Sequence, residues 1–217
     1  NTIKENDTII HLMDSLPKDL TKTFKLSVNK SKRLSSSSNH TATHLLHQAL
    51  RSVLGDHVQQ KGSMVSDKYL RFDFSHFSKL SEIDLENVEN FVNKKIIDHL
   101  ELEENRNSSF QDCIDDGIIA LFGEKYGDVV RSIKFGESHE LCGGTHVKNT
   151  SEIRSFIIKS ESAISTGIRR IEAISGDKAV DYLMKQAKTL KEISKIVLND
   201  KDPISALNKL KNQNLSS

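Results

Sequence analysis

The sequence is poor in cysteine and has no long apolar run, and both absences narrow what the protein can be. Its 217 residues include only two cysteines, Cys113 and Cys142. Two cysteines are too few for a disulfide framework, so we expect a reducing, cytoplasmic setting. No apolar run approaches the roughly 20 residues that a membrane-spanning helix needs. The first residues lack the apolar core of a signal peptide, and the missing initiator Met suggests a piece of a longer chain.

The motifs of two common hydrolase types are also missing. Residues 41–43 hold no glutamate, so the HExxH motif that supplies the usual general base of a zinc protease is absent. Neither a GxSxG elbow nor a Ser-His-Asp order is found. A hydrolytic function would therefore require a different set of residues.

The composition is otherwise that of an ordinary globular protein, with 36% hydrophobic and 28% charged residues. The net charge of +1 hides an uneven distribution, because bases dominate residues 18–33 and acids dominate residues 82–116. Contact with a polyanion such as RNA is expected at the basic arm rather than the acidic region. The candidate phosphate-binding residues of this arm are Lys22, Lys25, Lys30, Lys32 and Arg33.

Hydrophobic periodicity predicts a mixture of helices and strands. A polar break at 35–38 is expected to separate two strands, at 8–13 and 24–28, from a helix over 39–54 that Asn39 caps. The strands at 58–65 and 69–75 form an expected hairpin, with Leu70, Phe72 and Phe74 on one face. Further helices are expected over 82–100, 110–116, from 177 and from 204, and further strands over 101–107, 129–135, 152–159 and 168–174.

Two short segments offer metal ligands at the same spacing. His40 and His44 are four residues apart, and so are Cys142 and His146, about a hundred residues later. Three imidazoles and one thiolate form a set that suits Zn²⁺. We interpret His47 as a pocket residue rather than a fifth ligand. Four protein ligands normally make a closed, structural zinc site, so the spacing alone leaves the role of the metal open.

Six blocks of the sequence closely resemble the editing region of bacterial-type alanyl-tRNA synthetases, which is related to the threonyl-tRNA synthetase editing domain. The blocks occur in the right order and span about residues 39–176. They are NHTATHLLH at 39–47, QKGS at 60–63, LRFDF at 70–74, ALFGEKYG at 120–127, ELCGGTH at 140–146 and GIRRIEA at 167–173.

The resemblance implies an α+β fold and a domain organisation. It places the end of a small β-barrel at residues 1–36 and an antiparallel-sheet editing domain with packed helices at 37–176. The start of a C-terminal helical hairpin or coiled coil follows at 177–217. The aminoacylation domain lies outside the similar region, so we do not expect this chain to charge tRNA.

The resemblance also implies a function, the hydrolysis of the ester in mischarged Ser-tRNA(Ala) and Gly-tRNA(Ala). It makes His40, His44, Cys142 and His146 the zinc ligands. It places Thr43 and Gln60 in the substrate pocket, and Thr43, Gln60 and Cys142 are the catalytic candidates. Backbone N–H groups around Gly143 and Gly144 could stabilise an oxyanion. The alternative is a zinc-stabilised tRNA-binding module without hydrolytic activity.

Overall fold

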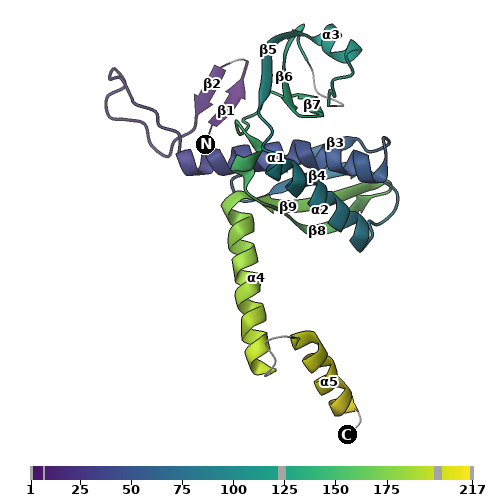
Figure 1. The fold of residues 1–217 in the computed structure, drawn as a ribbon. Coiled ribbons are helices and arrows are strands. Elements are labelled where there is room, and N and C mark those ends of the chain that lie inside the picture. Colours follow the sequence, from purple (N-terminus) through teal and green to yellow (C-terminus); the bar gives the residue numbers. More distant parts are fainter. Residues whose placement is uncertain (1, 7, 122–125, 198–201, 216–217) are drawn as a thin grey trace.

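Figure 1 shows a computed structural model of the chain, in which residues 2–6, 8–121, 126–197 and 202–215 are described. Four residues of the ALFGEKYG block, 122–125, lie outside this part. The described residues form an α+β fold whose sheets are antiparallel throughout, as the sequence predicts. Their helices are α1 (Lys30–Leu54), α2 (Glu82–Ile97), α3 (Phe110–Asp115), η1 (Thr150–Ile153), α4 (Gly176–Ile196) and α5 (Pro203–Leu215). Their strands are β1 (Thr2–Glu5), β2 (Thr8–His11), β3 (Gln60–Val65), β4 (Leu70–Ser75), β5 (Glu103–Ser109), β6 (Val129–Phe135), β7 (Ser138–Leu141), β8 (Phe156–Ser165) and β9 (Ile168–Ser175).

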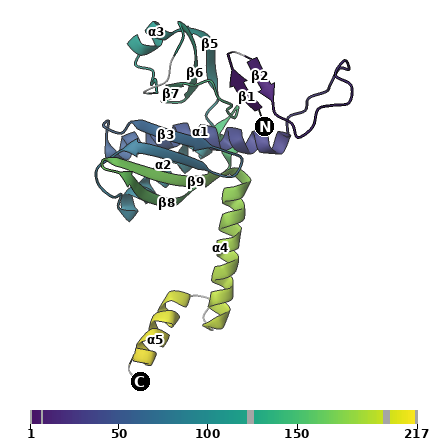
Figure 2. The ribbon, with the colours of Figure 1, turned by 180° about the vertical axis from the view of Figure 1, so that it is seen from behind.

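The core lies between α1, α2 and a four-stranded sheet of order β3-β4-β9-β8. Both helices cover the same face of this sheet (Figures 1 and 2). The predicted hairpin is confirmed, and Leu70, Phe72 and Phe74 are fully buried on the helix side. On the other face of β4, Asp73 pairs with Arg170 of β9 through two hydrogen bonds of 2.7 and 2.8 Å. This alternation fixes the register of the sheet.

Helix α1 begins nine residues earlier than predicted, and the expected flexible break at 35–38 is wrong. Asn29 caps the helix by accepting a hydrogen bond from the Lys32 N–H at 3.0 Å. Ser37 is buried and donates to the Arg33 carbonyl at 2.9 Å, so its hydroxyl is satisfied within the helix. Tertiary packing here overrides the low helix propensity of a serine run.

Asn39 is therefore an interior residue of α1 and not its cap. Its side chain donates to the Ser66 carbonyl at 2.9 Å and accepts from the Ser175 hydroxyl at 2.7 Å. These contacts tie α1 to the β3–β4 turn and to the end of β9. The predicted domain boundary at residues 36 and 37 falls inside α1, and the three-part division of the chain stays a prediction.

The N-terminal region differs from its prediction. β1 and β2 pair with each other, and no closed barrel is formed by the described residues. The strand expected at 24–28 is not formed, because Phe24, Leu26 and Val28 are exposed and the segment pairs with no strand described here. That residues 1–36 form the end of a small β-barrel stays a prediction.

A three-stranded sheet of order β5-β6-β7, with the short helix α3, forms a second unit beside α1 in Figure 1. Cys113, Ile118, Val130 and Leu141 make its small core. β7 was not predicted, and it leads directly into the segment 142–146. The expected strand at 152–159 begins later, because residues 150–153 form a capped 3-10 turn that Asn149 and Glu152 stabilise.

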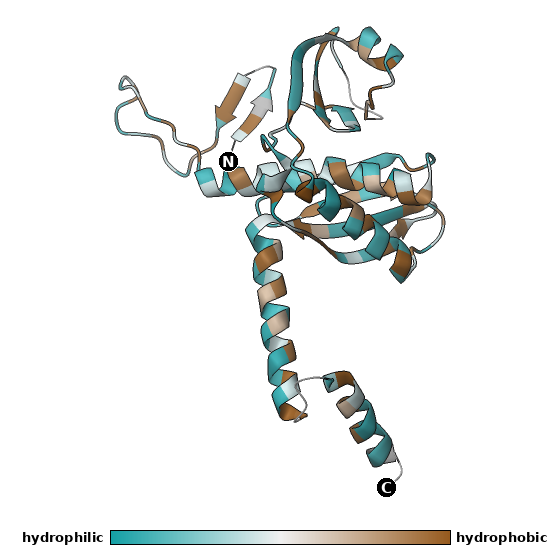
Figure 3. Cartoon of the chain, viewed as in Figure 1, coloured by the Kyte–Doolittle hydropathy of each residue, from teal (hydrophilic) through white to brown (hydrophobic). Residues whose placement is uncertain are grey.

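Helices α4 and α5 extend away from the core (Figures 1 and 2). The helix expected from 204 is confirmed and begins one residue earlier, because proline occupies the first position of α5, where its missing N–H costs nothing. Apolar residues of α4 such as Leu183 and Leu190 are half exposed and alternate with polar ones along the helix (Figure 3). No helix in the described ranges is long and apolar enough to cross a membrane.

Candidate metal centre

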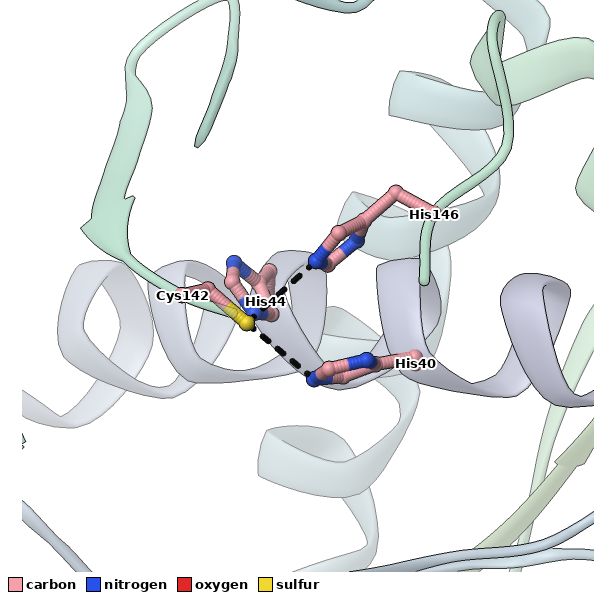
Figure 4. Close-up of side chains that lie close together, drawn as sticks. All are labelled: His40, His44, Cys142 and His146. Atoms are coloured by element: carbon pink, nitrogen blue, oxygen red, sulfur yellow. Dashed lines mark hydrogen bonds between the residues drawn. The ribbon is translucent and has the colours of Figure 1, made fainter. Parts of the chain in front are cut away.

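The four predicted metal ligands come together in one cluster. His40 and His44 extend from consecutive turns of α1, while Cys142 and His146 lie in the segment after β7 (Figure 4). One potential ligand atom from each residue lies within 4.8 Å of those of the others. The Cys142 sulfur is 3.5 Å from His40 Nε2 and 3.4 Å from His146 Nε2. This arrangement of three imidazoles and one thiol can hold a metal ion.

Each histidine of the cluster is oriented by a contact to the remainder of the protein. His44 Nδ1 lies 3.3 Å from the Glu140 carboxylate, and His146 Nδ1 lies 3.1 Å from the Thr41 hydroxyl. His40 forms a hydrogen bond with the backbone of Thr145. Such partners fix the ring orientation of metal-binding histidines and direct the other nitrogen to the ion. Here they leave the Nε2 atoms for the centre of the cluster.

Gly144 is required by the close approach of the metal-ligand segment to α1. A Cβ atom at this position would lie 1.9 Å from His40 Cε1, which no side chain can accommodate. The Gly144 N–H donates to the Cys142 sulfur at 3.4 Å, a contact that favours the thiolate. Gly143 differs, because it is exposed and its added Cβ would meet nothing within 4 Å.

Arg131 of β6 holds the metal-ligand segment 142–146 in place by hydrogen bonds to its carbonyl groups. Its guanidinium donates to the Cys142 carbonyl at 3.1 Å and to the Gly144 carbonyl, and a further N–H donates to Glu104 at 2.8 Å. The Cys142 N–H in turn donates to the Arg131 carbonyl at 3.0 Å. The segment therefore keeps its shape without belonging to a helix or strand.

Burial sets the protonation of the cluster. Burial and then the neighbouring His44 lower the pKa of His40 to about 4, and the same causes lower the pKa of His146 to about 2. Burial also lowers the pKa of His44. For Glu140, burial raises the pKa, but its contacts with His44 and His47 outweigh burial and hold the pKa below its usual value. Three neutral imidazoles are the form that binds metal.

The other predicted site residues are not all near the four ligands. Thr43 is 3% exposed, and its hydroxyl donates to the Asn39 carbonyl at 2.8 Å, within its own helix. Gln60 contacts Ser63 at 3.2 Å and lies on the wall of a cavity that His47 also lines. The five basic residues of the N-terminal arm are exposed, on the segment before α1 and in its first turn: Lys22, Lys25, Lys30, Lys32 and Arg33.

Sequence reasoning missed the residues that support the ligands, namely Thr41, Arg131 and Glu140. Glu140 precedes Cys142 by two residues, and a carboxylate beside a CxxxH motif could have indicated a histidine partner. Arg131 gave no such indication, because its role arises from the pairing of β6 with β7.

Comparison with known proteins agrees with this picture. The family described as "Threonyl and Alanyl tRNA synthetase second additional domain" matches residues 130–172. The alanine–tRNA ligase of Christiangramia forsetii is 58% identical over 216 residues, which is 100% of this chain and 25% of that protein. The alanine–tRNA ligase of Flavobacterium psychrophilum is 51% identical, over 99% of this chain and 24% of the relative. That of a Thermotoga species is 50% identical over 79% of this chain and 20% of its own length.

The chain thus spans about a quarter of the length of the curated relatives that it matches. The similarity is high and covers the core, both halves of the metal-ligand cluster and the terminal segments. The chain is similar over nearly its whole length to one segment of alanine–tRNA ligases, and its residues 130–172 match the second additional domain of threonyl and alanyl tRNA synthetases.

Proposed function

We propose that this chain is a zinc-containing editing domain that hydrolyses the ester of mischarged Ser-tRNA(Ala) and Gly-tRNA(Ala). The observation that carries the proposal is the cluster of His40, His44, Cys142 and His146 in a chain that is similar to one segment of alanine–tRNA ligases. We further propose that it acts within an alanine–tRNA ligase, in the cytoplasm, with tRNA(Ala) as its partner.

The need for such an activity has a physical cause. A pocket that accepts alanine cannot exclude glycine, which is smaller, and it rejects serine poorly, because serine adds only a hydroxyl group. A second site that hydrolyses the wrong esters restores accuracy. A domain of this kind with a built cluster of ligands is a suitable place for that site.

Zinc is the metal that best fits the donors. Three imidazoles with one thiolate form a common four-ligand zinc set, whereas magnesium and calcium prefer oxygen ligands. When bound, zinc supplies Lewis-acid polarisation and a fixed positive charge near the ester. Glu140, Thr41 and Arg131 orient the ligands before any substrate arrives, which is the preorganisation that a catalytic site needs.

We assign the contacts to the substrate, the water and the oxyanion to three further residues, Thr43, Gln60 and Gly143. The Thr43 hydroxyl donates to the Asn39 carbonyl, so its oxygen is left as an acceptor toward a serine hydroxyl. We assign Gln60 to substrate or water binding at the neighbouring cavity. Gly143 is exposed beside Cys142, and its N–H is our candidate donor to the oxyanion, since the Gly144 N–H is directed to sulfur.

The test is the release of serine from Ser-tRNA(Ala) by the zinc-loaded chain. We expect hydrolysis that Cys142→Ala abolishes together with zinc binding. Cys113→Ala is the matched control, because Cys113 lies in the small core of the β5–β7 unit and is not one of the clustered ligands. Binding of the tRNA without release of serine would refute the esterase function.

That result would favour the second candidate, a zinc-stabilised tRNA-binding module. The observation behind it is the number of protein donors, because four ligands normally complete a structural zinc site. In either case we propose that the exposed basic arm binds phosphates, through Lys22, Lys25, Lys30, Lys32 and Arg33.

A further inference from the structure

Two histidines outside the metal-ligand cluster meet at the end of the β3–β4 hairpin. His57 lies in the turn between α1 and β3, and His76 follows the last residue of β4. His57 Nε2 lies 2.9 Å from His76 Nδ1, a hydrogen-bond distance. Gly55, which ends α1 with a φ of 113°, leaves space for the His57 ring, because an added Cβ would lie 3.3 Å from its Nδ1. The His57–His76 pair therefore joins the end of α1 to β4.

The backbone on both sides of the pair is held by hydrogen bonds. The Ser75 hydroxyl donates to the His57 carbonyl at 2.8 Å and accepts from the Gln59 N–H at 2.9 Å. The His76 N–H donates at 3.0 Å to the carbonyl of Gly167, in the turn between β8 and β9. The two rings are thus brought together by the fold and do not depend on two free side chains finding each other.

The rings meet end to end, and this geometry decides what they can share. The 5.2 Å between the ring centroids exceeds the nitrogen–nitrogen distance by the width of one ring. The two nitrogens therefore lie on the line that joins the rings, and a single hydrogen fits between them, donated by one ring and accepted by the other. A metal ion held by both nitrogens would need lone pairs that converge beside this line. The pair is accordingly not part of the metal-ligand group found among the described residues.

The groups that face His76 come from three elements. Burial, then His57 and Arg169 of β9, lower the pKa of His76, whereas Asp84 of α2 and Glu161 of β8 act in the opposite direction. Both acids already have partners, because Asp84 closes the capping box of α2 and Glu161 is paired with Arg169. Protonation of both rings of the pair therefore requires an acidic medium.

The surroundings of His57 are more open. The residue is exposed, and the neighbouring Asp56 carboxylate is paired with Arg51 at 2.9 Å. The His57 ring is consequently the partner that can turn toward solvent when the contact is lost.

We propose that the His57–His76 pair is a proton-sensitive contact that loosens the turn between α1 and β3 when both rings are protonated. Two imidazolium rings carry a hydrogen on every nitrogen, so two N–H groups would face each other across 2.9 Å. The two positive charges would also repel each other at that separation. The segment that loses this contact, residues 55–59, leads directly into β3. The inference does not depend on the proposed hydrolysis, because the pair lies outside the metal-ligand cluster.

Hydrogen exchange of the neighbouring amides tests this proposal. The Val58 N–H donates to the Gly55 carbonyl at 3.2 Å, and the Ser75 N–H donates to the Gln59 carbonyl at 3.0 Å. After correction for the intrinsic pH dependence of exchange, we expect the protection of both amides to fall roughly tenfold between about pH 8 and pH 5, the range in which histidine changes its charge. The amides of β9, a central strand of the sheet, are the reference and should stay protected.

His57→Gln and His76→Gln are the matched variants, because glutamine can form a hydrogen bond in place of the ring but does not titrate. Either change should remove the pH dependence at Val58 and Ser75, and His11→Gln, at an exposed histidine elsewhere, should leave it unchanged. If the unmodified chain keeps the same protection at both pH values, the proposal is overturned. It is also overturned if the β9 amides lose protection in parallel, since the loss then belongs to the whole fold, or if both glutamine variants retain the full pH dependence.

Discussion

The two halves of the metal-ligand cluster have the same four-residue spacing but different support. His40 and His44 lie one turn apart on α1, where main-chain hydrogen bonds fix their separation. Cys142 and His146 lie in a segment without helix or strand. That segment is held by side chains from elsewhere, such as Arg131, which binds two of its carbonyls.

The difference shows where the cluster is vulnerable. The helix half is anchored by fully buried neighbours such as Leu45 and Leu46, so it keeps its geometry as long as the core is folded. The loop half depends on individual polar contacts, including the 3.0 Å contact between Ser37 and Thr145. Single substitutions should therefore disturb the loop half without unfolding the protein.

The largest effect is expected at Gly144. Replacing it with alanine places a methyl group against the His40 ring, so the two halves can no longer meet. We expect Gly144→Ala to weaken zinc binding by more than about 100-fold, beyond the range typical of changes to outer partners. Gly143→Ala is the matched control and should change affinity by less than about threefold, because its Cβ meets nothing. Zinc titration against a competing chelator measures both, and equal affinities would contradict the steric argument.

The next effect concerns the carboxylate that orients the helix half. Glu140→Gln removes the charge that holds the N–H groups of His44 and His47. We expect zinc affinity to fall by about 10–100-fold while the protein stays folded. Glu137→Gln is a control at an exposed acid of the β6–β7 turn. A Glu140→Gln protein with normal affinity and normal activity would show that His44 is positioned by the helix alone.

A smaller effect is expected from pH in the metal-free protein. The pKa of His40 is lowered from 6.5 to about 4, chiefly by burial and then by His44, so folding favours the neutral ring. This stability is present above pH 6.5 and is lost as the pH falls toward 4, because the unfolded chain then binds protons that the folded chain does not. The free energy of unfolding in urea should decrease over this window. His40→Gln should reduce the slope, and an unchanged slope would assign the pH dependence to other groups.

The smallest effect is expected outside the cluster, in the basic arm. Changing Lys30, Lys32 and Arg33 together to glutamine should weaken tRNA binding similarly for all sequences. It should also reduce the salt dependence by about one unit of slope for each phosphate that the variant no longer neutralises. Changing Lys185, Lys188 and Lys191 of α4 is the control for a general decrease in positive charge. If only the α4 variant reduces the salt dependence, the RNA-binding surface is assigned to α4 and not to the basic arm.

Much of the fold could be predicted because it depends on local patterns. The alternation of Leu70, Phe72 and Phe74 predicts a strand with one buried face, and the structure confirms it. The start of the last helix, expected at 204 and found at Pro203, was equally local. The errors arose where distant contacts outweigh local preference: Ser37 reads as a loop residue, yet its burial and its contact with Thr145 keep it in α1. Phe24 and Val28 read as strand residues, but both are exposed and their segment pairs with no described strand. A strand without a partner leaves its backbone hydrogen bonds unmade, so it does not form.

The sequence by itself determined the four candidate ligands and their chemistry. Donor identity depends only on residue type, and His40 and His44 need only a helix to face the same way. Tertiary structure decided the rest, because Glu140, Arg131 and Gly144 act across about a hundred residues of sequence or through strand pairing. It also decided that His47 lines a cavity while its buried Nε2 atom has no hydrogen-bond partner in the described part of the chain. No spacing rule encodes such contacts, since they exist only after the β5–β7 unit and α1 have packed together.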